Sequence, residues 1–303
     1  MKAFYADHFV LPLPSGHRFP MEKYRWLRDS IMQSLPDVDL HEANAATEGE
    51  LALVHTPAYV QAVLGGQLSA EQQREIGFPW TPEMAQRALR SVGGTIQACR
   101  AALQDGLGAN LAGGTHHAYA DRGGGFCVFN DMAVAARLMQ AEWRRKPRTT
   151  LRDMRVAIVD LDVHQGNGTA AIFAQDASVF TLSLHGERNF PFRKEHSDLD
   201  VGLPDGCTDG PYLAALDEAL TQLERRFEPD LLLYLAGADP HEGDRLGRLQ
   251  ISTEGMAARD ARVFAWARQR QCPVAFAMGG GYGRDLATTI EVQLNTYRAA
   301  LAA

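Results

Sequence analysis

Polar residues directly after an apolar run are the first sign of chemistry in this sequence. Residues 156–159 predict a strand buried on both faces, and Asp160, Asp162 and His164 follow it with apolar residues between them. Because side chains alternate along an extended segment, these three groups are expected to project to one side. Two carboxylates and an imidazole so close together would be poorly solvated alone, so they predict a divalent metal.

Asp239 is the best candidate for a further ligand, because it ends a second apolar run, LLLYLAGADP. Together with Asp162 and His164 it would give three protein ligands and a vacant position. That arrangement is typical of a catalytic zinc site, in which the metal lowers the pKa of water and polarises a carbonyl. The same donor set suits Fe(II), Co(II) or Mn(II), and a loop cap is the simpler interpretation of Asp239 alone.

Two adjacent histidines and a tyrosine could supply acid–base groups. His116 and His117 follow a short predicted strand at 109–112, and Tyr282 stands among glycines in GGGYG. Imidazole titrates near neutral pH, so it can take a proton from water and deliver it to a leaving amine. A tyrosine on a flexible loop can present its hydroxyl to a developing oxyanion. Taken singly, a turn with two imidazoles and a buried structural tyrosine are the simpler interpretations.

The elements that must position these groups alternate between strand and helix. Helices are expected at 21–33, in two short pieces of 50–64 separated at Pro57, at 82–103, 131–143, 169–174 and 212–227, after 252 and at the end of the chain. Thr81 followed by Pro82, and either Asn130 or Asp131, are expected to start the helices at 82 and 131, and His55 is expected to cap or pack. Irregular loops are expected at 76–82 and 186–204. This order predicts an α/β fold, one domain over residues 1–303, with a mostly parallel sheet covered by helices on both faces. The carboxyl ends of such strands line one crevice. The polar residues expected there are His116, His117, Asp160, Asp162, His164, His185, Asp239 and Tyr282.

Composition and charge narrow the possible partners. A net charge of −7 with a pI of about 5.8 argues against nucleic-acid binding, and the one dense basic run fits a solvated helix end. No signal sequence and no apolar run of about eighteen residues are present, so no membrane segment is expected. The four scattered cysteines favour a reducing compartment, and we expect a soluble cytoplasmic protein. The basic run comprises Arg144, Arg145, Lys146 and Arg148.

The motifs taken together resemble the zinc-dependent histone deacetylase family, which shares its fold with arginase. GGTHHA, GGGFCVFND, DLDVHQGNG, SLH, LAGADPHEGDRLG and GGGYG occur in the family's order over nearly the whole chain. DLDVHQGNG with GDRLG is most similar to the class IV branch and its bacterial relatives. The resemblance implies hydrolysis of the amide bond of acylated lysine, in peptides or proteins, or of small acylated amines. It does not indicate an oligomeric state.

The same resemblance implies a role for each candidate residue. His117 would act as general base and then acid, His116 backed by Asp160 would tune the charge, and Tyr282 would polarise the amide carbonyl. The ligands of Zn(II), or of Fe(II) or Co(II), would be Asp162, His164 and Asp239. The walls of a narrow lysine tunnel would be Gly125 and Phe126, with Phe190 or Phe192 opposite. A structural K⁺ would be held by the backbone carbonyls of Asp160, Asp162, His164 and Leu184 and by the Ser183 hydroxyl.

Two departures limit what the resemblance transfers, and one further position narrows the substrate class. Many family members place a second Asp behind the second histidine, whereas this chain has Asn167, so His117 is expected to be less basic here. No acid that would grip the substrate backbone is identifiable, and the loop IGFPWTP is a candidate to replace it. Polyamine deacetylases of this fold carry an acidic gatekeeper where this chain has Leu246, with Glu242 nearby. A neutral wall favours acyl-lysine over a polycation.

Other functions fit parts of the same pattern. A ureohydrolase of the arginase type needs two metals and a further aspartate, but Gln165 and Asn167 follow the DxDxH pattern here. A catalytically silent protein could keep the fold to bind acylated ligands, although the intact ligands, histidine pair and Tyr282 argue against it. Acetylpolyamines, other small amides and longer acyl chains remain possible substrates, because the depth of the pocket is not readable from the sequence.

Overall fold

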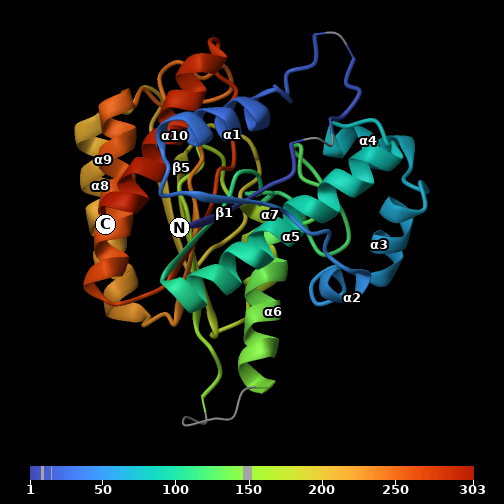
Figure 1. Cartoon of the computed structure of the whole chain (residues 1–303), viewed down its shortest axis with the longest axis horizontal. Helices are drawn as coiled ribbons and strands as arrows, with labels where there is room; N and C mark the ends of the chain where they lie inside the picture. Colours follow the sequence, from blue (N-terminus) through green and yellow to red (C-terminus); the bar gives the residue numbers. More distant parts are fainter. Residues whose placement is uncertain (8–9, 15, 146–151) are drawn as a thin grey trace.

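A single eight-stranded sheet, in which every pairing is parallel, runs through the molecule in the order β2-β1-β3-β8-β7-β4-β5-β6 (Figure 1). A computed structural model describes residues 1–7, 10–14, 16–145 and 152–303 of the chain. The predicted α/β fold with a parallel central sheet is confirmed. The strands are β1 (Lys2–Tyr5), β2 (Asp39–Glu42), β3 (Leu107–Asn110), β4 (Val156–Asp160), β5 (Val179–Gly186), β6 (Leu199–Leu203), β7 (Leu231–Leu235) and β8 (Val274–Ala277).

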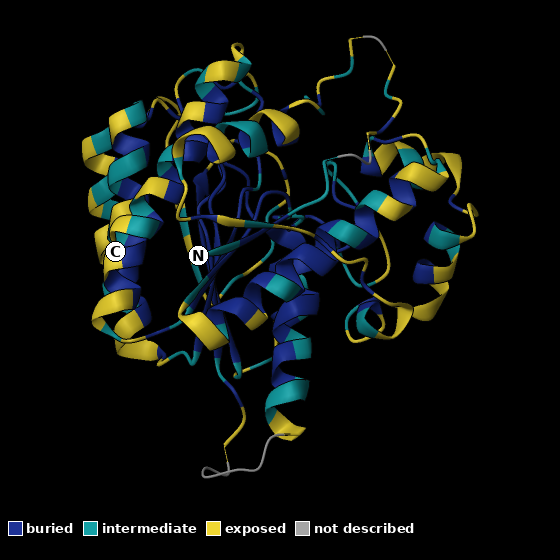
Figure 2. Cartoon of the chain, viewed as in Figure 1, coloured by how far each residue is buried: buried dark blue, intermediate teal, exposed yellow. Residues whose placement is uncertain are grey.

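Helices cover both faces of this sheet. One group comprises α1 (Lys23–Ser34), α8 (Asp209–Arg226), α9 (Thr253–Gln269) and α10 (Leu286–Ala302). The other face is covered by α5 (Pro82–Asp105), α6 (Asp131–Arg145) and α7 (Asn167–Phe173). Beyond these helices, away from the sheet, lie α2 (Glu48–Leu51), α3 (Pro57–Leu64) and α4 (Ala70–Ile76) (Figure 1). A separate apolar core fills each side, and Figure 2 shows the buried strands between helices whose outer surfaces are exposed. None of the helices in the described ranges is both long and apolar enough to cross a membrane.

Local chemistry explains where several elements begin. Thr81 caps α5 by accepting the backbone N–H of Met84 at 3.1 Å, and Pro82 occupies the first helical position, as predicted. Asn130 caps α6 by accepting the N–H of Ala133 at 3.0 Å. His55, expected to pack or cap, is buried and accepts the backbone N–H of Asn130. Each of these contacts fixes the entry into an element that flanks the site.

Two strands and one helix were not anticipated. The loop predicted at 186–204 is wrong in part, because it contains β6, and the polar stretch before residue 50 contains β2. Both are edge strands with exposed side chains, so they lack the continuous apolar run that identified β4 and β7. The helix α4 begins at a capping box formed by Ser69 and Gln72. In the basic run, Arg144 pairs with Asp153 at 3.0 Å, whereas Lys146 and Arg148 lie outside the described residues.

Candidate metal and catalytic site

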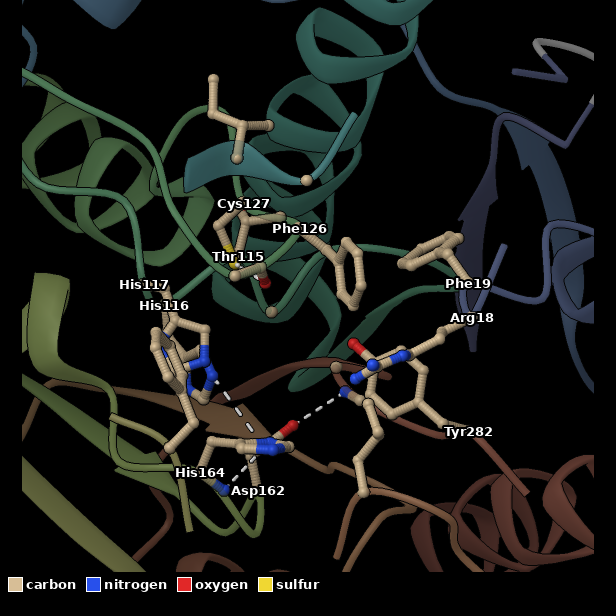
Figure 3. Close-up of a pocket in the computed structure, with 18 of the residues that line it drawn as sticks. Arg18, Phe19, Thr115, His116, His117, Phe126, Cys127, Asp162, His164 and Tyr282 are labelled. Atoms are coloured by element: carbon tan, nitrogen blue, oxygen red, sulfur yellow. Dashed lines mark hydrogen bonds and ion pairs between the residues drawn. The ribbon is translucent and has the colours of Figure 1, made fainter. Parts of the chain in front are cut away.

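Loops that follow β3, β4 and β8 meet at one pocket of about 450 Å³ (Figure 3). These strands occupy the middle of the sheet, and parallel strands end at one edge, so residues far apart in sequence converge there. His116, His117, Asp162, His164 and Tyr282 all line the pocket, as expected from the sequence. Asp160, His185 and Asp239 were expected there as well but do not line the pocket themselves. Asp160 and Asp239 are buried beside His116 and His164, and the His185 ring hydrogen-bonds the Ser183 hydroxyl at 2.9 Å.

Asp162, His164 and Asp239 form a buried cluster in which one ligand atom of each lies within 4.8 Å of the others. Nδ1 of His164 is 2.9 Å from Oδ1 of Asp162 and 3.2 Å from Oδ2 of Asp239. The predicted extended geometry is wrong beyond Asp160, where β4 ends. There the chain turns, because Oδ1 of Asp160 accepts the N–H of Asp162 and Oδ1 of Asp162 accepts the N–H of His164. The turn still brings Asp162 and His164 next to Asp239.

The donor set of this cluster fits a divalent cation. Oδ2 of Asp239 is buried without a hydrogen-bond partner, while its Oδ1 accepts the backbone N–H of Val163 at 2.9 Å. Burial, together with the charge of Asp162, raises the pKa of Asp239 to about 7. A Cβ at Gly280 would lie 1.9 Å from Oδ2, so only glycine permits this approach. An unsatisfied buried carboxylate oxygen beside a second carboxylate and an imidazole is what a bound metal would neutralise.

The two histidines are held in different protonation states. Nδ1 of His116 is 2.6 Å from Oδ2 of Asp160, and although burial opposes the charge, Asp160 and Asp162 outweigh it and raise the pKa of His116 to about 9. Burial, followed by the positive charges of His116 and His164, lowers the pKa of His117 well below its usual value. Near neutral pH the pair therefore combines a charged imidazolium with a neutral imidazole.

Neighbours of Asn167 identify which nitrogen of His117 is free. Glu195 can only accept, so the Tyr119 hydroxyl donates to its Oε1 at 3.0 Å and accepts from Nδ2 of Asn167 at 3.1 Å. Oδ1 of Asn167 then faces Nδ1 of His117 at 2.7 Å and accepts its N–H. The lone pair of His117 is consequently on Nε2. Tyr119 and Glu195 had no sequence signal, since their role depends on this packing.

Replacing Asn167 with Asp is expected to move the acid limb of the pH–rate profile upward by roughly one to two pH units. A carboxylate at this position would stabilise the protonated form of His117 and raise its pKa, and a general base is inactive once it is protonated. The measurement is kcat/KM against pH. Asn295→Asp, which adds the same charge on α10, should leave the limb in place. An unchanged limb in Asn167→Asp would contradict this account of His117.

The loop that carries Tyr282 is held by two buried charged residues that sequence reasoning missed. Its backbone N–H donates to Oδ2 of Asp244 at 2.6 Å, and Nζ of Lys23 lies 3.2 Å from the carbonyl oxygen of Gly279. Burial, then the charges of Asp239 and Asp162, raises the pKa of Tyr282 well above its usual value. The phenol therefore stays protonated and can donate a hydrogen bond. Asp244 belongs to the GDRLG motif, so a signal for it was present in the sequence. Lys23 had no such signal, because nothing in the sequence of an amphipathic helix distinguishes it from a solvent-facing lysine.

The histidine loop has a buried anchor of the same kind in Asp131. Its carboxylate accepts the N–H groups of Gly114 and Thr115 at 3.0 and 2.7 Å, and the Thr115 hydroxyl at 2.7 Å. Asp131 was considered in the sequence only as a helix cap. Its contacts instead fix the backbone directly before His116.

The four residues predicted for the tunnel, Gly125, Phe126, Phe190 and Phe192, line the pocket, and so does Leu246 at the gatekeeper position. The rings of Phe190 and His117 are 4.9 Å apart, and those of Phe126 and Tyr282 are 5.9 Å apart. Gly125 has a φ of +53°, and a Cβ there would lie 2.6 Å from the His117 ring. Phe192 is 87% exposed, which puts it at the outer edge. The five residues thus form walls that lead from the surface to His117 and Tyr282.

The five residues named for potassium are all buried. Asp160 ends β4, Asp162 and His164 follow it, and Ser183 and Leu184 lie within the paired strand β5. Asp160 on β4 pairs with Ser183 on β5, so Asp160, Ser183 and Leu184 lie side by side next to the loop that carries Asp162 and His164. A monovalent cation there would border the proposed metal ligands.

Comparisons with known proteins find similarity to histone deacetylases along most of the chain. A model described as the histone deacetylase domain matches residues 17–296. An uncharacterised protein of Picosynechococcus sp. is 43% identical over 284 residues, which cover 93% of this chain and 92% of the relative. Histone deacetylase 2 of Arabidopsis thaliana is 35% identical over 287 residues, covering 89% and 71%. The crystal structure of an HDAC homologue complexed with SAHA superposes with a TM-score of 0.77 at 25% identity, covering 97% of this chain and 83% of that chain.

Proposed function

Since this chain belongs to the histone deacetylase family, we propose that it is a Zn(II)-dependent hydrolase that cleaves the amide bond of acylated lysine. The observation that carries the proposal is the buried Asp162–His164–Asp239 cluster, whose unsatisfied oxygen is close to the pocket that His117 and Tyr282 line. The acyl-lysine substrate follows from family membership and from the apolar tunnel walls.

Each group in the pocket has a distinct part in the proposed reaction. Zn(II) held by the three ligands would supply a Lewis acid that lowers the pKa of water and polarises a carbonyl. Nε2 of neutral His117 would take the proton of the attacking water and return it to the leaving amine. The Tyr282 hydroxyl would donate a hydrogen bond to the carbonyl oxygen as charge develops on it. His116, kept positive by Asp160, would stabilise negative charge beside His117.

Several finer expectations belong to the same proposal. A structural K⁺ would use the carbonyls of Asp160, Asp162, His164 and Leu184 with the Ser183 hydroxyl, and would stiffen the loop that carries the metal ligands. Class IV character, a cytoplasmic location and one domain over 1–303 stay predictions. Fe(II) or Co(II) could replace Zn(II) in this donor set.

Turnover across a panel of acylated substrates tests the proposal. Acetyl-, octanoyl- and myristoyl-lysine peptides and acetylpolyamines should be compared with the zinc-loaded protein, with and without SAHA. We expect hydrolysis of at least one acyl-lysine peptide and its inhibition by SAHA, since a homologue of this fold is found in complex with that compound. Peptide binding without hydrolysis would instead support a silent binding protein, and two metals per chain would support a ureohydrolase.

A glutamate at position 246 should shift preference toward polyamines. Leu246 lines the pocket, so Leu246→Glu would place a carboxylate where the second ammonium group of an acetylpolyamine could reach it. Acetylpolyamine kcat/KM is expected to rise roughly fivefold relative to acetyl-lysine peptide, the ratio that about 1 kcal/mol of ion pairing gives. Leu53→Glu is the control, since Leu53 is already exposed and does not line the pocket. An unchanged ratio would contradict the specificity assigned to Leu246.

A further inference from the structure

The mouth of the pocket is positively charged although the whole chain is acidic, with a net charge of −7. Four exposed arginines line the pocket: Arg18, Arg74, Arg188 and Arg248. They come from four separate segments, namely the chain before α1, helix α4, the loop after β5 and the loop after β7. The one exposed carboxylate among the lining residues is Glu75. The summed charge of these exposed lining residues is therefore positive, whereas the net charge of the whole chain is negative.

Most of these guanidinium groups have no internal partner. Arg248 pairs with Asp205 at 3.1 Å. The side chains of Arg18, Arg74 and Arg188 make no ion pair or hydrogen bond with the described part of the chain. Figure 3 shows Arg18 on the Tyr282 side of the pocket, across from the histidine pair. Unpaired guanidinium groups on opposite sides of a substrate tunnel are free to contact what enters it.

Guanidinium groups recognise carboxylates, because their forked donors match the two oxygens of the anion. The same charges repel polycations, which adds to the neutral wall at Leu246. We propose that the substrate carries carboxylates next to the acylated amine, an inference that rests on the proposed deacylase function. Two sources share this chemistry: acidic side chains that flank an acyl-lysine in a peptide, and the α-carboxylate of acyl-lysine itself. Arginine-flanked acyl-lysines and acetylpolyamines are disfavoured.

The test compares capped acetyl-lysine peptides with Asp, Gly or Arg on both sides of the lysine. Initial rates give kcat/KM, and Kd is measured on Tyr282→Phe so that the peptide is not consumed. At low salt the Asp peptide should exceed the Arg peptide roughly tenfold in kcat/KM, and the ratio should fall toward one as salt screens exposed charges. Free Nε-acetyl-lysine and its α-amide separate the two sources, because only the free amino acid has the α-carboxylate.

Variants that remove charge test whether the arginines at the mouth of the pocket cause the preference for the Asp peptide. Arg74→Gln/Arg188→Gln should reduce the Asp-to-Arg peptide ratio severalfold. Arg225→Gln/Arg268→Gln removes the same charge from exposed helix positions away from the pocket and should leave the ratio unchanged. Equal rates and Kd values for all three peptides would overturn this inference while leaving the deacylase proposal standing. A preference in Kd with no hydrolysis of any acylated substrate would reject the deacylase proposal instead.

Discussion

Asp239→Asn is expected to deplete the protein of metal and to lower kcat/KM for acetyl-lysine peptides by roughly a thousandfold or more. The side chain keeps its shape, and its remaining oxygen can still accept the N–H of Val163. What the substitution removes is the negative charge and the free oxygen, Oδ2, which is buried without a hydrogen-bond partner 3.2 Å from Nδ1 of His164. Metal per chain by elemental analysis and peptide turnover should therefore fall together.

A matched substitution of a surface aspartate distinguishes loss of the metal from the general effect of removing a carboxylate. Asp217→Asn removes an exposed carboxylate that pairs with Arg262 at 3.0 Å, and it should keep about one zinc per chain and normal turnover. Exhaustive chelation of the unaltered protein should reproduce the loss, and added Zn(II) should reverse it. Full activity after chelation, or an active metal-loaded Asp239→Asn, would end the account of this cluster.

It was predictable from the strands alone that the candidate site residues would lie close together. Buried parallel strands read as continuous apolar runs, so β4 and β7 were recognisable, and the residues after them had to reach the same edge of the sheet. Asp162 and Asp239 were found in this way, and His116 and Tyr282 were found because they follow the short apolar strands β3 and β8. The edge strands β2 and β6 were missed because their exposed side chains carry no such run.

The residues that hold the site in place were not predictable. Lys23 reaches Gly279 across 256 positions of sequence, and Asp131 reaches the histidine loop from the start of α6. A charged residue in a helix normally faces water, and only the packed structure shows that these are buried. The arginines at the mouth of the pocket were not predictable either, because each comes from a different segment and only the folded chain brings them together. The sequence thus indicated the candidate site residues but not the buried residues that hold them in place.

Arg259→Met is expected to lower the free energy of unfolding by roughly 3 to 5 kcal/mol, because it leaves a buried carboxylate without its counter-charge. The side chains of Arg259 and Asp260 are both 0% exposed, and Nε of Arg259 donates to Oδ1 of Asp260 at 2.8 Å. Denaturant unfolding measures the change. Arg262→Met on the same helix removes a guanidinium that pairs with an exposed carboxylate, so it should cost less than about 1 kcal/mol.

Arg259 also connects the two loops that carry the proposed metal ligands. Its Nη1 donates to the carbonyl oxygens of Leu161 and Gly237, at 3.2 and 2.6 Å. Leu161 directly precedes Asp162, and Gly237 is two residues before Asp239. Loss of this donor should let the two loops separate and weaken zinc binding by roughly ten- to a hundredfold, as removal of supporting contacts around metal ligands does. Competition with a chromophoric chelator gives the zinc affinity.

The double variant Arg259→Met/Asp260→Asn distinguishes the two roles of this arginine. Neutralising Asp260 removes the uncompensated charge, while the amide can still accept the Thr296 hydroxyl, so much of the lost stability should return. Zinc affinity should stay low, because the carbonyls of Leu161 and Gly237 still lack their donor. If stability and zinc affinity recovered together, Arg259 would serve only to balance a buried charge, and the geometry of Asp162 and Asp239 would have to be maintained by the backbone alone.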